Sequence, residues 1–267
     1  MKQPRPPLTP NFEEEAMRPE LALPLFNHVL KDFVGNGTLD YERTIRTGEL
    51  LSLQDHETAL VNHDGTTFVI SHQCQELKLK LIAHELSHTI DLLDRRELAA
   101  TITTLDRVRI VFQCLTAELE ILETLSPRSY QTIRETLGHG SGQESPGFNQ
   151  LLNAGPLLWS RLEAILQAAG ATLEGVYDHP EQHPDLFALC ESFTTLDANY
   201  QKWLYHHFML VKRIIGVARD VPSLAQNATT QLAASMMRPM FDPLWRMRCA
   251  MTREWVETRP ATPGHGV

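Results

Sequence analysis

The sequence predicts an all-α protein, built as a bundle of long helices. Apolar residues recur at helical spacing along several long stretches. Residues that begin helices, such as Ser126-Pro127, and residues that end them, such as Gly170, stand at the boundaries of these stretches. No segment shows convincing strand alternation. With 267 residues, the chain is long enough to bury a core and a pocket for a cofactor.

Three regions are expected along the chain. Residues 1–38 form an N-terminal arm and a short helix. The arm is expected to be extended because residues 1–20 are rich in proline and acidic side chains, and residues 21–34 read as the helix. Residues 39–257 form the main helical domain, and residues 258–267 form a flexible tail.

The main domain is expected to contain one short helical piece, over residues 49–55, and six longer helices. The first long helix spans residues 66–94, with Asp64 or Thr66 as the capping acceptor. Ser126 is expected to cap a later helix that has Pro127 at its first position. Helices are also expected over residues 97–125, 127–137, 148–169, 185–215 and 224–257. The helix over residues 185–215 could break near Thr194. Pro239 and Pro243 are expected to kink or split the helix over residues 224–257.

The composition argues against several kinds of partner. A net charge of -9 and a pI near 5.7 give no basis for a nucleic-acid groove or for binding to an anionic membrane. The four cysteines form no CxxC or CxxCH pattern, so a structural zinc site or a covalently attached heme has no support. The N-terminus lacks the apolar segment of a signal peptide, and no apolar run reaches the length of a membrane span. We therefore expect a cytoplasmic protein.

The helix over residues 66–94 carries two different histidine chemistries. His84-Glu85-Leu86-Ser87-His88 matches the HExxH pattern, in which two imidazoles share Zn²⁺ and the glutamate acts as a base. At about 100° per residue, however, Phe68 and His72 fall on the apolar stripe, whereas His84 and His88 lie near the opposite, wetter face. No strong third-ligand motif follows. The pattern favours His72 as the buried functional histidine and a solvated face for the HExxH pair.

A second histidine pair is resolved by the same argument. His207 falls on an apolar stripe of its helix, whereas His206 lies near polar residues. An inward imidazole on a long helix is either a ligand of a metal or heme iron or a hydrogen-bonded core residue.

A third group of candidate residues begins on the helix that starts at Pro127. Tyr130, Arg134, Leu137 and Ser141 recur at helical spacing, with Ser141 just beyond the helix in a glycine-containing loop. An arginine beside a tyrosine suits a planar carboxylate, because the guanidinium can donate two parallel hydrogen bonds. The alternative is an exposed Arg134 paired with Glu135 or another surface acid.

These pieces together resemble tryptophan 2,3-dioxygenase and the wider superfamily of histidine-ligated, heme-dependent aromatic oxygenases. The resemblance is a set of motifs in chain order that covers residues 39–248. The motifs are YERTI with ELLSLQ at 41–54, FVISHQ, EL and HEL at 68–86, LETLSP with Tyr130, Arg134, LG and SG at 122–142, WLYHH with RIIG at 203–216, and FDPLWRMR at 241–248. The family carries its own HEL triplet without binding metal there, which sets the zinc hypothesis aside.

The resemblance implies a helical bundle around a pocket for heme b (iron protoporphyrin IX), with O₂ as co-substrate. It implies a role for each matching residue. His207 would be the proximal iron ligand, and His72 would be the catalytic distal histidine near the substrate ring and the oxygen. Tyr130 and Arg134 would hold the substrate carboxylate. Phe68, Tyr41 and Leu137 would line the pocket, and Ser141 would lie at the heme edge and the substrate.

The implied reaction is insertion of oxygen into the indole ring of L-tryptophan or a tryptophan derivative, by monooxygenation or 2,3-dioxygenation. Val221 stands where the family's GTGGS loop has the threonine that meets the substrate ammonium group, and Thr44 replaces a pocket tyrosine. Such departures fit a divergent member from secondary metabolism. The alternatives are a tyrosine-type aromatic hydroxylase, a HExxH zinc hydrolase and a noncatalytic heme-binding protein. A homo-oligomer, either a dimer or a tetramer, is implied as well.

Overall fold

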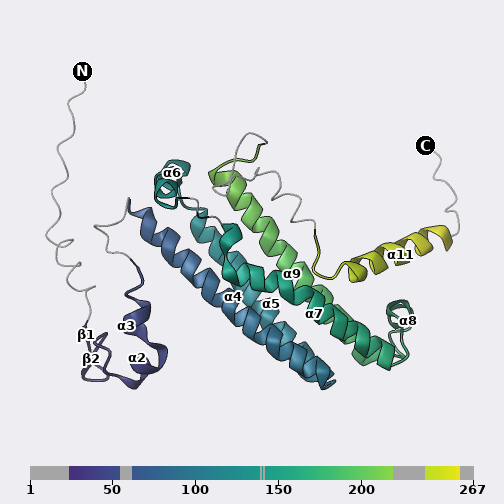
Figure 1. The fold of residues 1–267 in the computed structure, drawn as a ribbon. Helices are drawn as coiled ribbons and strands as arrows, with labels where there is room; N and C mark the ends of the chain where they lie inside the picture. The colour runs from purple at the N-terminus through teal and green to yellow at the C-terminus, as the bar shows by residue number, and fades with distance from the viewer. Residues whose placement is uncertain (1–23, 55–61, 139, 141, 219–237, 259–267) are drawn as a thin grey trace. The chain divides into compact units, whose positions relative to one another are not determined.

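The computed structural model describes residues 24–54, 62–138, 140, 142–218 and 238–258. The chain divides into two compact units, Met1–Ala59 and Leu60–Val267. Most described residues are helical, which confirms the predicted all-α class (Figure 1). The predicted domain boundaries after residues 38 and 257 stay predictions.

The first unit contains a small hairpin where the sequence had suggested a helix. Strand β1 (Leu25–Asn27) pairs antiparallel with β2 (Asp32–Val34). The Asn27 side chain accepts hydrogen bonds from the backbone N–H groups of Val29 and Leu30, both at 2.9 Å, and Lys31 has a φ of 54°. An Asn-initiated turn with a left-handed residue reverses the chain, so the helix predicted over residues 21–34 is wrong in its described part.

Two short helices complete the described part of the first unit. Helix α2 (Asp40–Ile45) and helix α3 (Thr47–Leu50) are separated by Arg46, whose φ of 59° interrupts the helical path. The helical piece predicted over residues 49–55 therefore begins earlier and is shorter than expected.

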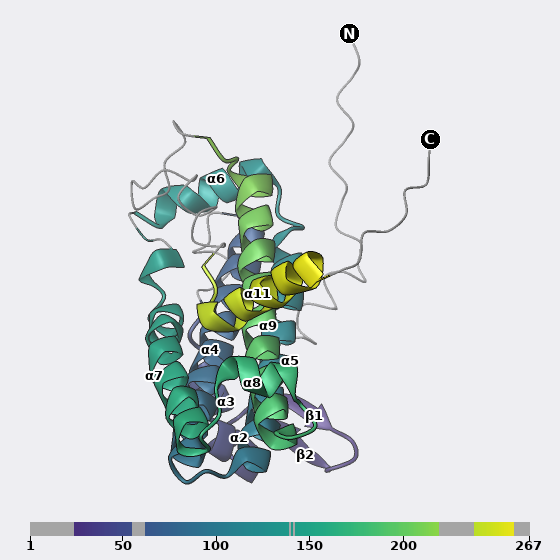
Figure 2. The same ribbon diagram turned by 90° about the vertical axis from the view of Figure 1, so that its right-hand side faces the viewer.

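The second unit is built from four long helices that lie side by side (Figures 1 and 2). They are α4 (Asp64–Asp94), α5 (Leu98–Leu122), α7 (Pro146–Ala168) and α9 (Pro184–Ile214). Helix α4 packs against α5 and α7, and α5 packs against α9. The apolar stripes of these helices meet in one core whose largest fully buried side chains include Phe112, Phe193, Ile82, Leu86, Leu105, Leu115, Leu158 and Leu162.

The ends of these helices follow the predicted signals in most places. Ser126 caps α6 (Pro127–Thr136) by accepting a hydrogen bond from the N–H of Ser129 at 3.0 Å, and Gly138 follows the helix with a φ of 59°. Helix α9 runs through Thr194 without the predicted break. The predicted cap of α4 is wrong, because α4 begins at Asp64 with no side-chain hydrogen bond to its first turn.

Shorter pieces connect the long helices. Helix α8 (Leu173–Asp178) forms in a segment expected to be loose, and the 3₁₀ turn η2 (Gly142–Glu144) precedes α7. The last helix was predicted over residues 224–257. Residues 219–237 lie outside the described part of the chain. Of the described residues, 238–241, which include Pro239, are not helical, and the helix α11 spans Asp242–Thr258.

The register between α4 and α7 decides which turns of α4 are covered by α7. Gly147 lies against α4 so closely that a Cβ there would stand 2.6 Å from Cβ of Leu79. Farther along both helices, Arg161 of α7 forms an ion pair with Asp94 of α4, with Nε and Oδ1 3.4 Å apart. The two helices therefore run parallel, and the α4 residues that precede this contact extend beyond the start of α7.

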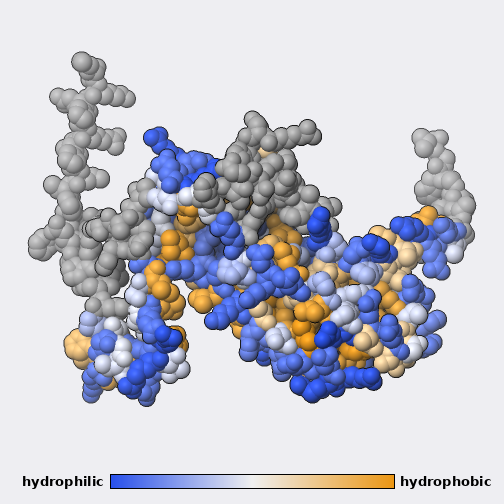
Figure 3. All heavy atoms as spheres, viewed as in Figure 1, coloured by the Kyte–Doolittle hydropathy of each residue, from blue (hydrophilic) through white to orange (hydrophobic). Residues whose placement is uncertain are grey.

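Helix α6 lies across this same end of the bundle (Figure 2). Its contacts are with α4 and α9, and the side-chain amide of Asn62 donates a hydrogen bond to the Ser129 carbonyl at 3.1 Å. Hydrophilic and hydrophobic side chains are interspersed on the visible face of the second unit (Figure 3). No helix in the described ranges has the length and apolar character needed to cross a membrane.

Candidate active site

The first turns of α4 supply Phe68 and His72. Their rings are 4.1 Å apart between centroids, and Nδ1 of His72 lies 2.7 Å from the Phe68 carbonyl oxygen. A carbonyl only accepts, so Nδ1 carries the proton and donates it to this bond. In the neutral ring, Nε2 is then the nitrogen that keeps a lone pair and can accept a hydrogen bond from a ligand.

His72 is more open than the helical pattern predicted. The residue is exposed, because α7 begins beside Leu79 and leaves the earlier turns of α4 uncovered on that side. Loss of solvation nevertheless lowers the pKa of His72, while the hydrogen bond to Phe68 and the charge of Glu76 act in the opposite direction. His72 is therefore a neutral imidazole at the end of the bundle rather than a core residue.

Helix α6 brings Tyr130 and Arg134 to the same end. The Tyr130 ring lies 6.0 Å from the Phe68 ring. Burial raises the pKa of the Tyr130 hydroxyl, and the nearby positive charge of Arg134 opposes that shift. Arg134 and Leu137 are both half-buried. A phenol and a guanidinium beside an aromatic wall can hold a carboxylate.

Helix α9 contributes a second histidine, His207. Burial is the main cause that lowers the pKa of His207 to about 4, and the proximity of His72 is the second. The two imidazoles therefore lie close enough to interact, although they come from helices far apart in sequence. At neutral pH His207 is uncharged and has a lone pair available for a metal.

The surroundings of His207 are mostly aromatic. Its ring lies 6.0 Å from that of Trp203, which in turn lies 5.5 Å from Phe148 of α7. Gly142 of η2 stands beside Nε2 of His207, since a Cβ at Gly142 would be 4.0 Å from that atom. Trp203 is 5% exposed, and its indole N–H has no acceptor among the described residues.

This set of groups fits a flat, largely apolar cofactor bound through one imidazole. His207 offers a neutral nitrogen, and Phe148 and Trp203 supply aromatic walls. The indole N–H of Trp203 has no acceptor among the described residues, so it could donate to an oxygen of a bound group. The residues that the sequence predicted on α4, α6 and α9 are brought together here.

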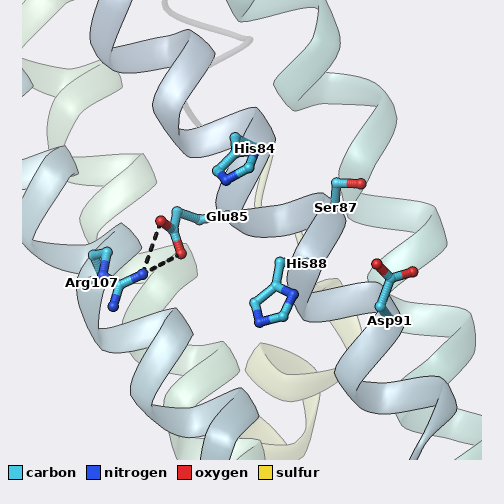
Figure 4. A pocket seen from close by; sticks show the side chains of 6 residues that line it. All are labelled: His84, Glu85, Ser87, His88, Asp91 and Arg107. Carbon is cyan, nitrogen blue, oxygen red and sulfur yellow. Dashed lines mark hydrogen bonds and ion pairs between the residues drawn. The ribbon is translucent and has the colours of Figure 1, made fainter. Parts of the chain in front are cut away.

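The HExxH residues lie elsewhere, on the outer face of α4 (Figure 4). His84 and His88 are exposed and line an open depression together with Asp91. Glu85 is buried and turned toward α5, where Nη1 of Arg107 donates to both of its carboxylate oxygens at 2.9 and 2.8 Å.

This arrangement does not suit zinc hydrolysis. Because both oxygens of Glu85 are engaged by Arg107, the glutamate is poorly placed to act as a base. Within the part of the chain that the structure describes, no group of three His, Cys, Asp or Glu residues could hold a metal ion. The solvated-face interpretation of His84 and His88 agrees with their exposure.

Several predicted site residues lie outside the described residues or in the other unit, so their positions relative to this site are not defined. Ser141 and Val221 lie outside the described residues. Tyr41 and Thr44 are on α2 in the other unit, where Tyr41 is 68% exposed. Their roles stay predictions.

The sequence argument had also missed residues that shape the site. Glu76, one turn after His72, accepts a hydrogen bond from the N–H of Gly147 at 3.1 Å and so fixes the start of α7 beside the site. Its spacing of four residues from His72 could have predicted this, because residues four apart are neighbours on a helix surface. Trp203, one turn before His207, carried the same kind of signal.

Comparison with known proteins gives a consistent family. A sequence profile described as Tryptophan 2,3-dioxygenase matches residues 28–157. The chain is 29% identical to a tryptophan 2,3-dioxygenase of Xanthomonas campestris pv. campestris, over 84% of this chain and 90% of the relative. It is 28% identical to that of Xanthomonas oryzae pv. oryzae, over 84% and 91%. It is 25% identical to that of Herpetosiphon aurantiacus, over 79% and 97%.

Proposed function

Because this chain belongs to the tryptophan 2,3-dioxygenase-like superfamily, a family of oxygenases, we propose that it inserts oxygen from O₂ into the indole ring of L-tryptophan or of a tryptophan derivative, with heme b as its cofactor. One observation carries the proposal: the Phe68 ring of α4 lies 4.1 Å from the His72 ring and 6.0 Å from the Tyr130 ring of α6, and His72 also influences the aromatic-walled His207 of α9.

His207 is the residue that would hold the heme iron. Its imidazole is neutral because burial lowers its pKa to about 4, so it needs no deprotonation before it binds a metal. When bound, the heme supplies the activation of O₂, which protein side chains cannot provide.

Arg134 and Tyr130 would hold the amino-acid end of the substrate. The guanidinium and the phenolic hydroxyl together offer donors to a carboxylate, and the raised pKa of Tyr130 keeps its proton in place. Anchoring the carboxylate in this way fixes where the aromatic ring lies, which is a proximity effect.

His72 would orient the ring. Its Nδ1 proton is engaged by the Phe68 carbonyl, so Nε2 is left to accept the indole N–H of the substrate. The Phe68 ring, 4.1 Å from that imidazole, supplies an aromatic wall. An aromatic ring with an N–H donor therefore matches this acceptor, and a phenol O–H could reach it as well.

The sequence departures support a modified substrate or a monooxygenation. Val221 cannot donate or accept through its side chain, so an ammonium group would need another partner than the family's threonine. Thr44 likewise leaves more room than the tyrosine it replaces.

Mass spectrometry of the product tests the proposal. The heme-reconstituted, reduced protein is incubated under ¹⁸O₂ with tryptophan, methyl-tryptophan or tyrosine in parallel. We expect product from an indole substrate, with two labelled atoms for ring cleavage or one for hydroxylation or oxindole formation. Product from tyrosine alone would replace the proposal with the tyrosine-type hydroxylase, and no product from any of the three would overturn it.

A further inference from the structure

Trp203 carries a buried polar atom that has no partner in the part of the chain that the structure describes. The side chain is 5% exposed, and no described residue accepts a hydrogen bond from its Nε1–H. Buried N–H groups in native proteins nearly always have an acceptor, from the protein or from ordered water. The described chain also contains a satisfied counterpart: Nε1 of Trp245 donates to Oδ2 of Asp197 at 2.8 Å.

The position of this group points to the cofactor pocket. Trp203 stands one turn before His207 on α9, with the two rings 6.0 Å apart and inclined by 33°. Its other ring neighbours are Phe112 of α5, at 6.5 Å, and Phe148 of α7, at 5.5 Å. Neither phenyl ring carries a conventional acceptor, and a group bound beside His207 is well placed to supply one.

We propose that the Trp203 indole N–H donates a hydrogen bond to an oxygen acceptor enclosed with the cofactor on the His207 side of the pocket. The acceptor is either a carboxylate of the bound porphyrin or a water molecule trapped between the porphyrin and α9. The inference rests on the proposed heme binding and makes Trp203 a positioning residue for the cofactor, since the bound group would supply the acceptor that the described residues lack.

The test compares Trp203→Phe, which removes the donor and keeps an aromatic ring, with Trp159→Phe as the matched control. Trp159 belongs to α7 and packs 6.4 Å from Phe241, away from His207. Heme loss is measured by transfer to excess apomyoglobin. We expect loss from Trp203→Phe to be about tenfold faster than from the unmodified protein, the effect of one hydrogen bond of about 1.4 kcal/mol. Trp159→Phe should release heme at the unmodified rate.

A direct spectroscopic readout separates a donor from a packing residue. The chain has four tryptophans, so ¹⁵N labelling gives four indole N–H signals. We expect the signal that Trp203→Phe removes to exchange more slowly in the diamagnetic ferrous carbon monoxide complex than in the apoprotein. Should Trp203→Phe fail to fold, the isosteric replacement of Trp203 by 3-benzothienylalanine removes the N–H and keeps the ring shape.

The outcomes distinguish the sources and the possible failures. Iron etioporphyrin has no carboxylates, so a carboxylate acceptor predicts that its release is insensitive to Trp203→Phe, whereas a water acceptor predicts faster release of both porphyrins. Equal heme release from both proteins, with an indole N–H that heme does not protect, would overturn the inference. Absence of heme binding by the unmodified protein would instead overturn the proposed function.

Discussion

The ionisation of His207 links the site to the stability of the apoprotein. Burial and the neighbouring His72 hold the pKa of His207 at about 4, below its ordinary 6.5. As pH falls from 6.5 toward 4, the unfolded chain therefore binds a proton that the folded chain does not. Folding stability should decrease over this window by at most roughly 3 kcal/mol, and His72 adds to the loss in the same direction.

Urea unfolding of the apoprotein at a series of pH values measures this loss. His207→Gln should remove most of the decrease between pH 6.5 and 4, whereas His206→Gln, at the adjacent position, should retain it. An unchanged slope in His207→Gln would show that the imidazole is not held neutral by the fold.

The guanidinium of Arg134 provides a second prediction at this scale. Arg134→Lys keeps the charge and removes the planar pair of donors, so kcat/KM for a substrate with a carboxylate should fall by about a hundredfold, the loss of a charged hydrogen bond of about 2.7 kcal/mol. Turnover of tryptamine, which has no carboxylate, should change little. A similar loss for both substrates would mean that Arg134 does not bind the carboxylate.

Individual site residues were predictable where two signals agreed. Helical periodicity and the family resemblance both selected His72 and His207, and the structure brings both to one end of the bundle. The burial of His72 was not predictable, because its exposure depends on where α7 begins. That start is set by the contact of Gly147 with Leu79, two residues 68 positions apart in the sequence.

A buried carboxylate of α9 holds the start of α11. Asp197 of α9 is fully buried and accepts hydrogen bonds from the N–H groups of Met240 and Phe241, at 3.0 and 2.8 Å, and from the indole of Trp245. Asp197→Ala leaves these donors unpaired, so we expect a loss of about 3–5 kcal/mol in the free energy of unfolding.

An aspartate on α11 itself is the control. Asp242 pairs with Arg246 at a largely exposed position, so Asp242→Ala should change stability by less than about 1 kcal/mol in the same urea titration. Equal losses from the two substitutions would mean that Asp197 does not hold α11 in place.

The close contact between α4 and α7 can be tested with glycine substitutions. Gly147→Ala would place a Cβ 2.6 Å from Cβ of Leu79, so we expect a loss of about 1–3 kcal/mol in unfolding free energy, measured by urea titration. At Gly155→Ala the only close approach is to the flexible Met240 side chain, at 2.8 Å from its Cγ, while the Met240 carbonyl oxygen stays at an ordinary contact distance of 3.6 Å. The better helix propensity of alanine offsets part of that clash. A Gly147→Ala protein as stable as Gly155→Ala would contradict the close packing.

Helix positions were largely predictable because their signals are local. The Ser126 cap with Pro127 behind it marked the start of α6 correctly. The hairpin near Asn27 was missed, since its turn depends on a side-chain hydrogen bond and a left-handed residue rather than on apolar spacing. Short, polar segments give periodicity too little length to decide between helix and strand.

For the whole molecule, the all-α class followed from the sequence, but the pairing of helices did not. Which long helices touch is decided by contacts between distant residues, such as Glu76 with the N–H of Gly147, that no local pattern reports. Because α4 and α7 overlap only in part, His72 stays exposed and Phe68 half-buried at one end of the second unit. The bundle thus serves as a rigid support for a site built at its end.

Heme titration with matched histidine variants tests the central claim most directly. The unmodified protein should bind one heme and show a Soret band, which His207→Ala should abolish and His206→Ala should leave in place. His84→Ala, in the HExxH pattern, should behave like the unmodified protein. A Soret band that survives in His207→Ala, or stoichiometric zinc with no Soret band in the unmodified protein, would contradict a heme site built on His207.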